Sequence, residues 1–308
     1  MTNYDLCLAW NWEYDAEFVM LLDKACQSHS LSFLQITPNN LDGILHSLAS
    51  NQLAFRAFFD RASESDAKFF PVVEWGRDHA VYRINAYERA SRAWDKAAMH
   101  HELINAGLYT PYTIILPSYI EQPFLPLIDL SSLGQRFTIK PAHGGGGEGV
   151  IIEATSIDQV LRARQEYPAD RYLLQAHIFP AQLGFRPAWF RVICCGEEIF
   201  PCWWDTSTHV YTTLSPSEES QYGLRSLRQI AESIARICEL EIFSTEIALT
   251  SDGRFVVVDY VNDQIDLRLQ SRTFDGVPDD LVWDIANRLV ALVVSHCPPS
   301  SNKKDLMP

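Results

Sequence analysis

The spacing of apolar residues predicts an alternating α/β unit over the first ninety residues of the chain. Short apolar runs at 5–10, 31–36 and 53–59 are typical of buried strands, and apolar residues recur at helical spacing in 18–25 and 41–49. Because strands that alternate with helices usually form a parallel sheet, we expect a parallel sheet here.

The pattern after residue 85 is less regular and predicts a mixture of helices and short strands. A tight hairpin is expected at Asp252-Gly253, a residue pair that favours two-residue turns. Together with a length of 308 residues, this predicts two or three compact units. Residues 86–106 are expected to be rich in helix. Further helices are expected at 157–165, 227–237 and 281–292, and the expected strands span 137–140, 150–153, 172–179 and 189–195, with two more around the hairpin.

Composition narrows the class of protein. No apolar run approaches twenty residues, and the first residues lack a basic segment followed by an apolar one, so we expect neither a membrane span nor a signal peptide. Seven cysteines without CxxC spacing indicate reduced thiols and a cytoplasmic protein. A net charge of −14 disfavours a nucleic-acid partner. The sequence leaves the oligomeric state open, a homodimer included.

A cluster of glycines lies between two expected strands. Gly144, Gly146 and Gly149 have the GxGxxG spacing of dinucleotide-binding proteins, but that motif requires a helix directly afterwards, and residues 150–152 are typical of a strand. A P-loop is excluded because no Lys-Ser or Lys-Thr follows. Such a turn can fold over phosphate oxygens as a mobile lid, with Lys140 adding positive charge. A flexible surface loop beside a solvated lysine is the alternative.

Further segments resemble, in order and spacing, the signatures of the ATP-grasp superfamily. Each segment is a weak signal alone, and the shared order over residues 85 to 295 carries the resemblance, which is greatest to the glutathione synthetase and ribosomal-protein glutamate ligase branch. The segments are Trp94-Asp95-Lys96 followed by Leu103, residues 106–108 and Thr110-Pro111; Lys140-Pro141 with the glycines; residues 174–178; Phe190-Arg191-Val192; and Glu246, Asp259 and Asn262.

The resemblance implies a fold class and a domain plan. An α/β N-terminal domain, residues 1–90, is expected to precede an α+β ATP-grasp domain. That domain would consist of a small lid subdomain, 91–170, and a large subdomain, 171–297, which clamp ATP between them. Residues 298–308 are expected to form a flexible tail.

The resemblance also implies roles for particular residues, with ATP and Mg²⁺ as cofactors. Positive side chains suit the phosphates, and carboxylate or amide oxygens suit Mg²⁺. Arg191 is expected to be catalytic through its contact with phosphate, and Mg²⁺ is expected on Glu246, Asp259 and Asn262. ATP is expected to contact Lys96, Lys140, His143, Gly144, Gly145, Gly146, Gly147, Gln175, Ala176, His177 and Ile178.

The spacing of the metal ligands departs from the family pattern. Two residues separate Asp259 from Asn262, so in a regular strand the two side chains point to opposite faces. A two-residue Asp-Gly turn would place Glu246 opposite Asp259, and a bulge at Tyr260-Val261 would return Asn262 to the same side. A three-residue turn would instead place Glu246 opposite Val258 and turn Asp259 away. We favour the bulge.

The substrate side departs from the family as well. Trp189 stands where an acidic residue is common, and the segment after Asn262 lacks the usual glycine- and proline-rich loop. Asp266 and Arg268 are expected to face a substrate, with a structural ion pair as the alternative. The expected activity is that of an ATP-dependent ligase that joins a small-molecule carboxylate and an amine through an acyl phosphate. A small-molecule kinase and a non-catalytic, regulatory ATP-binding protein are the alternatives.

Overall fold

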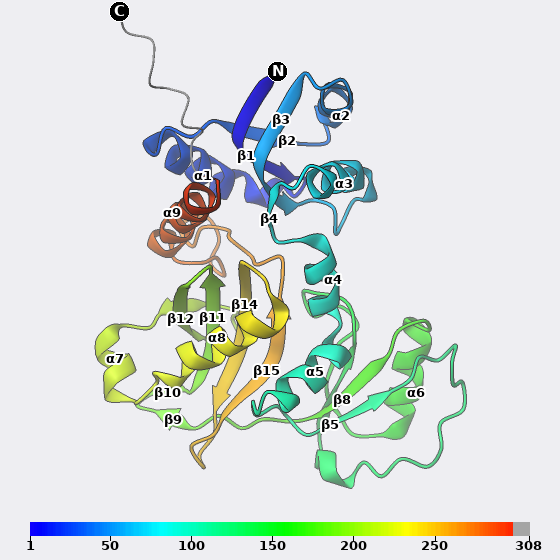
Figure 1. Cartoon of the computed structure of the whole chain (residues 1–308). Coiled ribbons are helices and arrows are strands. Elements are labelled where there is room, and N and C mark those ends of the chain that lie inside the picture. Colours follow the sequence, from blue (N-terminus) through cyan, green and yellow to red (C-terminus); the bar gives the residue numbers. More distant parts are fainter. Residues whose placement is uncertain (298–308) are drawn as a thin grey trace, which may run out of the picture. The chain divides into compact units, whose positions relative to one another are not determined.

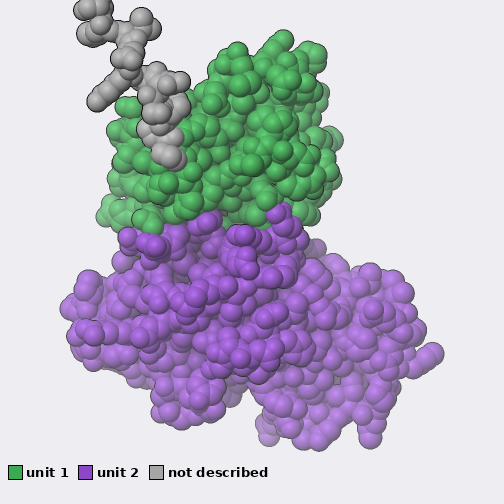
Figure 2. Space-filling view, in the orientation of Figure 1, with its two compact units in different colours: residues 1–87, 266–308 green, residues 88–265 purple. Residues whose placement is uncertain are grey.

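The computed structural model describes residues 1–297, which divide into two compact units (Figure 2). One unit contains residues 1–87 together with residues 266–297, and the other contains residues 88–265. Residues 266–297 thus group with the N-terminal residues, although the sequence-based plan placed them in the large subdomain. The expected tail at 298–308 lies outside the described residues. No helix within residues 1–297 is long and apolar enough to cross a membrane.

A parallel four-stranded sheet forms the centre of the first unit, as predicted (Figure 1). Its order is β2-β1-β3-β4, and residues 6–9 of the central strand β1 are almost completely buried, as expected for a strand covered on both faces. Helices α1 and α9 pack against each other. The elements are β1 (Thr2–Trp10), α1 (Ala16–Ser28), β2 (Phe33–Ile36), α2 (Leu41–Ala49), β3 (Leu53–Arg61), α3 (Phe70–Asp78), β4 (Tyr82–Ile84) and α9 (Asp279–His296), with short 3-10 turns η1 (Glu13–Asp15) and η2 (Ala67–Phe69).

Two antiparallel sheets form the second unit (Figure 1). The smaller has the order β5-β8-β6-β7 and the larger has the order β13-β12-β11-β14-β15. The strands are β5 (Thr113–Leu116), β6 (Phe137–Pro141), β7 (Ile151–Ala154), β8 (Tyr172–Ala176), β11 (Trp189–Cys195), β12 (Glu198–Trp204), β13 (Tyr211–Thr213), β14 (Ile242–Leu249) and β15 (Phe255–Asn262), with a separate short hairpin of β9 (Gln182–Leu183) and β10 (Arg186–Pro187).

The helices of the second unit cover these sheets. Helix α8 buries Leu227, Ala231 and Ile234 against the larger sheet, where it packs across β11, β12 and β15 (Figure 1). This apolar stripe has the helical spacing that the sequence predicted. The helices are α4 (Tyr87–Trp94), α5 (Lys96–Asn105), α6 (Ile157–Glu166), α7 (Pro216–Gln221) and α8 (Ser226–Cys238), with the short turn η3 (Ser131–Leu133).

The helix-rich segment predicted at 86–106 contains two helices, α4 and α5, with Asp95 between them. Asp95 is in an extended conformation, and its carboxylate accepts hydrogen bonds from the backbone N–H groups of Ala97 and Ala98 at 3.0 and 3.1 Å. An aspartate at this position stabilises a helix start, because the first N–H groups of a helix lack partners within it. The new start places Lys96 at the first position of α5.

Candidate nucleotide and metal site

Four side chains form one row across the larger sheet. Cys202 on β12 pairs with Arg191 on β11, Arg191 pairs with Glu246 on β14, and Glu246 pairs with Asp259 on β15. Directly paired residues of antiparallel strands point to the same face of a sheet. Arg191, Glu246 and Asp259 therefore share one face, as the metal-site prediction requires.

The turn between β14 and β15 has three residues, so the predicted two-residue turn is wrong. Thr250 donates its backbone N–H to the carbonyl of Arg254 at 2.9 Å, which leaves residues 251–253 as the turn. By itself, this turn would align Glu246 with Val258. The observed alignment of the carboxylates must therefore have another cause.

Two bulges in β15 provide that cause. The first leaves Val258 without a partner in β14 and aligns Glu246 with Asp259. The second lies at Tyr260-Val261 and returns Asn262 to the side of Asp259. The second bulge is the predicted one and is confirmed, whereas the first was not predicted. A bulge inserts one residue into one strand and so changes which side chains share a face.

Two lysines from other elements approach this part of β15. Lys140, near the end of β6, is only 7% exposed, and its Nζ donates to the carbonyl of Val258 at 3.1 Å. The bulge explains this bond, because it removes Val258 from the strand ladder and leaves the carbonyl open to another donor. Lys96 at the start of α5 donates from Nζ to the carbonyl of Gly144, in the glycine loop, at 2.5 Å.

The charges of this cluster influence one another. Burial opposes ionisation of Asp259, yet Lys140, Lys96 and Arg191 together hold the pKa of its carboxyl below the usual value. Burial raises the pKa of Glu246, and Asp259 adds to that rise, while Arg191 at 2.9 Å from its carboxylate acts in the opposite direction. Two adjacent carboxylates need cations to remain ionised together. Lys96, Lys140 and Arg191 already balance the two carboxylates, so a further cation fits here only together with an anion such as phosphate.

The donor set fits Mg²⁺ when phosphate completes the coordination. The pairing of β14 with β15 brings Glu246, Asp259 and the amide of Asn262 to one face as oxygen donors. Within residues 1–297, no three side chains of His, Cys, Asp or Glu are grouped to hold a metal without such help. Mg²⁺ in enzymes is usually bound by one or two carboxylates, with phosphates and water as the other ligands. Arg191 and the indole N–H of Trp189 now bond to Glu246, at 2.9 and 3.3 Å.

A buried polar network lies behind this cluster and was not predicted. The hydroxyl of Tyr260 lies 2.6 Å from Nδ1 of His100 and accepts from Nε2 of Gln175 at 2.7 Å. Burial lowers the pKa of His100 to about 4, with smaller effects from His101 and Lys140. The imidazole is therefore neutral near pH 7, and we assign its Nδ1 as the acceptor of the tyrosine proton. No local motif in the sequence marks these residues.

The network changes the expected part played by Gln175. Its side chain is 2% exposed and bonds to Tyr260 and to Oγ1 of Thr113, and its backbone lies within β8. Ala176 ends that strand and donates its N–H to Tyr112. His177 and Ile178 follow outside any strand, so their backbone groups are better placed to bind an adenine. The contact of these four residues with ATP stays a prediction.

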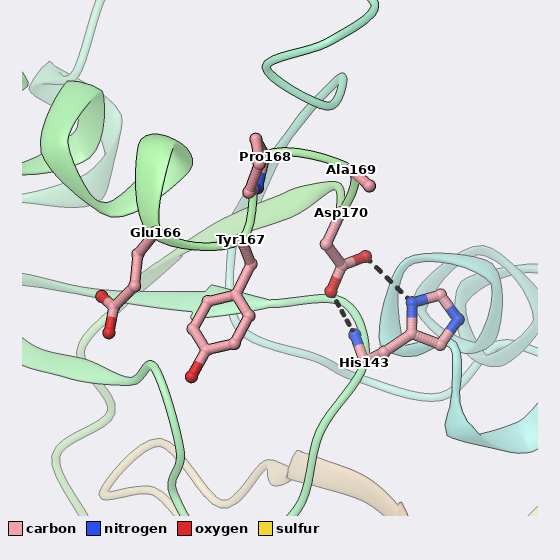
Figure 3. Close-up of a pocket in the computed structure, with 6 residues that line it drawn as sticks. All are labelled: His143, Glu166, Tyr167, Pro168, Ala169 and Asp170. Atoms are coloured by element: carbon pink, nitrogen blue, oxygen red, sulfur yellow. Dashed lines mark hydrogen bonds and ion pairs between the residues drawn. The ribbon is translucent and has the colours of Figure 1, made fainter.

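The glycine loop joins β6 to β7, as predicted. Gly144, Gly146, Gly147 and Gly149 have φ values of 105°, 61°, 80° and 69°, in the region that favours glycine over residues with a Cβ atom. His143, at the start of the loop, bonds to Asp170 beside an open hollow of about 450 Å³ (Figure 3). Asp170 raises the pKa of His143 through this hydrogen bond.

Asp266 and Arg268, the expected substrate residues, lie in the first unit. Arg268 bonds to Asp266 at 2.6 Å and to Asp275 at 2.9 Å, and its guanidinium lies 5.8 Å from the ring centroid of Trp12. The structure therefore contains the ion pair that the sequence left as the alternative.

Comparison with solved structures relates this geometry to known proteins. No family model matches the sequence, and no curated protein matches it either. D-alanine–D-alanine ligase from Bacillus anthracis, complexed with ATP, matches with a TM-score of 0.65 and 11% identity over 96% of this chain and 98% of that chain. A RimK domain ATP-grasp protein from Sphaerobacter thermophilus matches with a TM-score of 0.62 and 17% identity over 94% of this chain and 99% of that chain. The ATP-grasp ligase PsnB, complexed with minimal precursor, Mg and ADP, matches with a TM-score of 0.63 and 12% identity over 96% of this chain and 99% of that chain.

The chain has the ATP-grasp fold. The likeness spans nearly the whole chain and confirms the ATP-grasp fold that the resemblance implied. At identities of 17% or less, what is shared is the fold, so the roles of individual residues are argued from geometry and chemistry. The clamping of a nucleotide by two subdomains stays a prediction.

Proposed function

We propose that this protein is an ATP-dependent carboxylate–amine ligase that forms an amide or peptide bond through an acyl phosphate. The observation that best supports this is the charge cluster of the second unit. Lys96, Lys140 and Arg191, from three different elements, interact with the ionised Asp259 beside the half-buried Glu246. This combination suits a triphosphate with a divalent cation, and it occurs within an ATP-grasp fold.

Within this proposal, the nucleotide phosphates contact the lysines and the backbone N–H groups of the glycine loop. Lys140 is held in place by Val258, so its charge is preorganised for phosphate. Lys96 now bonds to Gly144, which would let it link the loop to the nucleotide. His143 lies at the start of this loop, where Asp170 accepts a hydrogen bond from its backbone N–H.

Glu246, Asp259 and Asn262 would hold Mg²⁺. When bound, the metal neutralises phosphate charge and orients the phosphate oxygens. Glu246 would then exchange its contact with Arg191 for the metal, and Arg191 would become available to a phosphate oxygen. The three ligands need both bulges of β15, because without the first Asp259 would face away from Glu246, and with the first alone Asn262 would face away from both.

The proposed chemistry has two steps. A carboxylate oxygen of the substrate attacks the γ-phosphorus of ATP, the bond to the β–γ bridging oxygen breaks, and ADP leaves. The amine then attacks the acyl carbon, inorganic phosphate leaves, and the nitrogen releases a proton. Arg191 stabilises the charge on the transferred phosphoryl group. Positioning and charge stabilisation are sufficient for such a transfer, so no protein nucleophile is required.

The substrates are a carboxylate and an amine, carried by small molecules or by peptides. The sequence predicted small molecules, but PsnB has also been captured with a precursor peptide and AMPPNP. This likeness is the reason to include both classes in the search for substrates.

The direct test is release of ADP in the presence of panels of acids with amines, both free and within peptides. The proposal predicts ADP release that requires both an acid and an amine. With ¹⁸O-labelled carboxylate, label should appear in the released phosphate. Phosphate attached to an alcohol would favour a kinase instead, and binding of ATP without turnover of any pair would favour a regulatory protein.

A further inference from the structure

The segment between α6 and β8, residues 167–171, is hydrogen-bonded to the N-terminal end of the glycine loop. The carboxylate of Asp170 accepts the backbone N–H of His143 at 2.8 Å and also bonds to Nδ1 of that histidine at 2.9 Å (Figure 3). It further accepts the backbone N–H of Arg171 at 2.8 Å, which fixes its own orientation. One side chain thus holds both the backbone and the ring of the residue that precedes the glycines.

The same segment contacts the C-terminal end of the loop through Tyr167. Its hydroxyl donates to the carboxylate of Glu148 at 2.9 Å. Its ring covers Gly149 so closely that a Cβ atom at that glycine would lie 2.7 Å from the ring and 3.2 Å from the side chain of Pro141. Real Cβ atoms do not approach so closely, so glycine is required here for space as well as for its φ of 69°.

The four glycines between these ends are open. A Cβ atom at Gly144, Gly145, Gly146 or Gly147 would meet no heavy atom of the described residues within 4 Å. Among the described residues, Lys96 is the one side chain outside the loop that bonds to these glycines, at the carbonyl of Gly144. The loop therefore combines two fixed ends with a tip that has room to move.

We propose that Asp170 and Tyr167 are positioning residues that hold the ends of the glycine loop, so that only its tip moves onto the phosphates. This inference rests on the proposed function for the identity of the ligand, but not for the geometry of the loop. A loop with fixed ends loses less conformational entropy when it closes over a ligand than a loop that is free along its whole length.

Amide hydrogen exchange tests, without any nucleotide, whether Asp170 holds the N-terminal end of the loop. In the nucleotide-free protein, the amide of His143 should exchange slowly and the amides of Gly145 to Gly147 quickly. In Asp170→Ala, exchange at His143 should accelerate at least about tenfold, a change of 1.4 kcal/mol or more in local opening. Asp170→Asn keeps an oxygen acceptor and should restore part of the protection. If His143 is unprotected in the wild type, or equally protected in Asp170→Ala, the inference is wrong.

The affinity for AMPPNP with Mg²⁺ tests the consequence for binding. Asp170→Ala should raise the dissociation constant at least about tenfold, and Tyr167→Phe, which keeps the ring over Gly149, should raise it less. Glu166→Ala is the matched control, since Glu166 lines the same hollow but its side chain forms no hydrogen bond or ion pair within residues 1–297. Unchanged affinity in Asp170→Ala would overturn the inference. A wild type that binds no nucleotide would refute the proposed function, while the exchange experiment would still decide about the loop.

Discussion

Removal of the Tyr260 hydroxyl tests whether the buried network maintains the site. The substitution Tyr260→Phe keeps the ring but deletes the hydroxyl that joins His100 and Gln175, at 2.6 and 2.7 Å. Gln175 still bonds to Thr113. Nδ1 of His100, by contrast, stays buried but has lost the hydroxyl that donated a hydrogen bond to it. Net losses of about 1 kcal/mol for each of the two hydrogen bonds, plus a burial penalty of about 1–2 kcal/mol for the orphaned nitrogen, give a total of about 3–4 kcal/mol.

Chemical denaturation, followed by tryptophan fluorescence and by circular dichroism, measures this loss. Two probes are needed because a chain of two compact units need not unfold in one step. Tyr112→Phe is the matched control, because Tyr112 is 54% exposed. The double variant Tyr260→Phe with His100→Leu should recover part of the loss, since two apolar partners leave no polar group unsatisfied. If Tyr260→Phe unfolds at the same denaturant concentration as Tyr112→Phe, the network does not stabilise the unit.

Two further predictions concern protonation and metal binding. Because burial holds the pKa of His100 near 4, below its unfolded value near 6.5, its neutral form stabilises the fold at high pH, and this contribution is lost as pH falls. The stability difference between wild type and His100→Gln should therefore change by about 3 kcal/mol between pH 6.5 and 4, and a constant difference would show that His100 is not buried and neutral. Glu246→Gln should weaken binding of ATP with Mg²⁺ about tenfold or more but leave metal-free ATP affinity unchanged, as titration calorimetry with and without Mg²⁺ can show. An equal effect under both conditions would argue against Glu246 as a metal ligand.

Much of the fold was predictable from the sequence, because its elements have clear periodicity. The parallel sheet of the first unit follows from short apolar runs that alternate with helical spacing. The interruption at Asp95 was missed, because a single capping residue hardly alters the apolar pattern of the two helices on either side.

The site was predictable where the residue types and their spacing indicate the ligand. It was not predictable where the pairing register of β14 and β15 determines which side chains share a face. The bulge at Tyr260-Val261 was expected from the spacing of Asp259 and Asn262, which otherwise would point apart. The three-residue turn and the compensating bulge at Val258 were missed, because Asp-Gly is compatible with either turn length and a bulge leaves no mark in an apolar strand. The network of His100 also escaped, since its members are up to 160 residues apart.

The central claim is that Lys140 and its neighbours bind the phosphates of ATP, and titration of Lys140→Met with ATP and Mg²⁺ tests it most directly. Methionine keeps most of the bulk and removes the charge that Val258 and Asp259 hold in place. Lys24→Met, at an exposed lysine of the first unit, is the control. Loss of one preorganised charge is worth about 2–4 kcal/mol, so the affinity of Lys140→Met should fall about 30- to 1,000-fold while Lys24→Met binds as the wild type does. Equal affinity in Lys140→Met and the wild type would contradict the account.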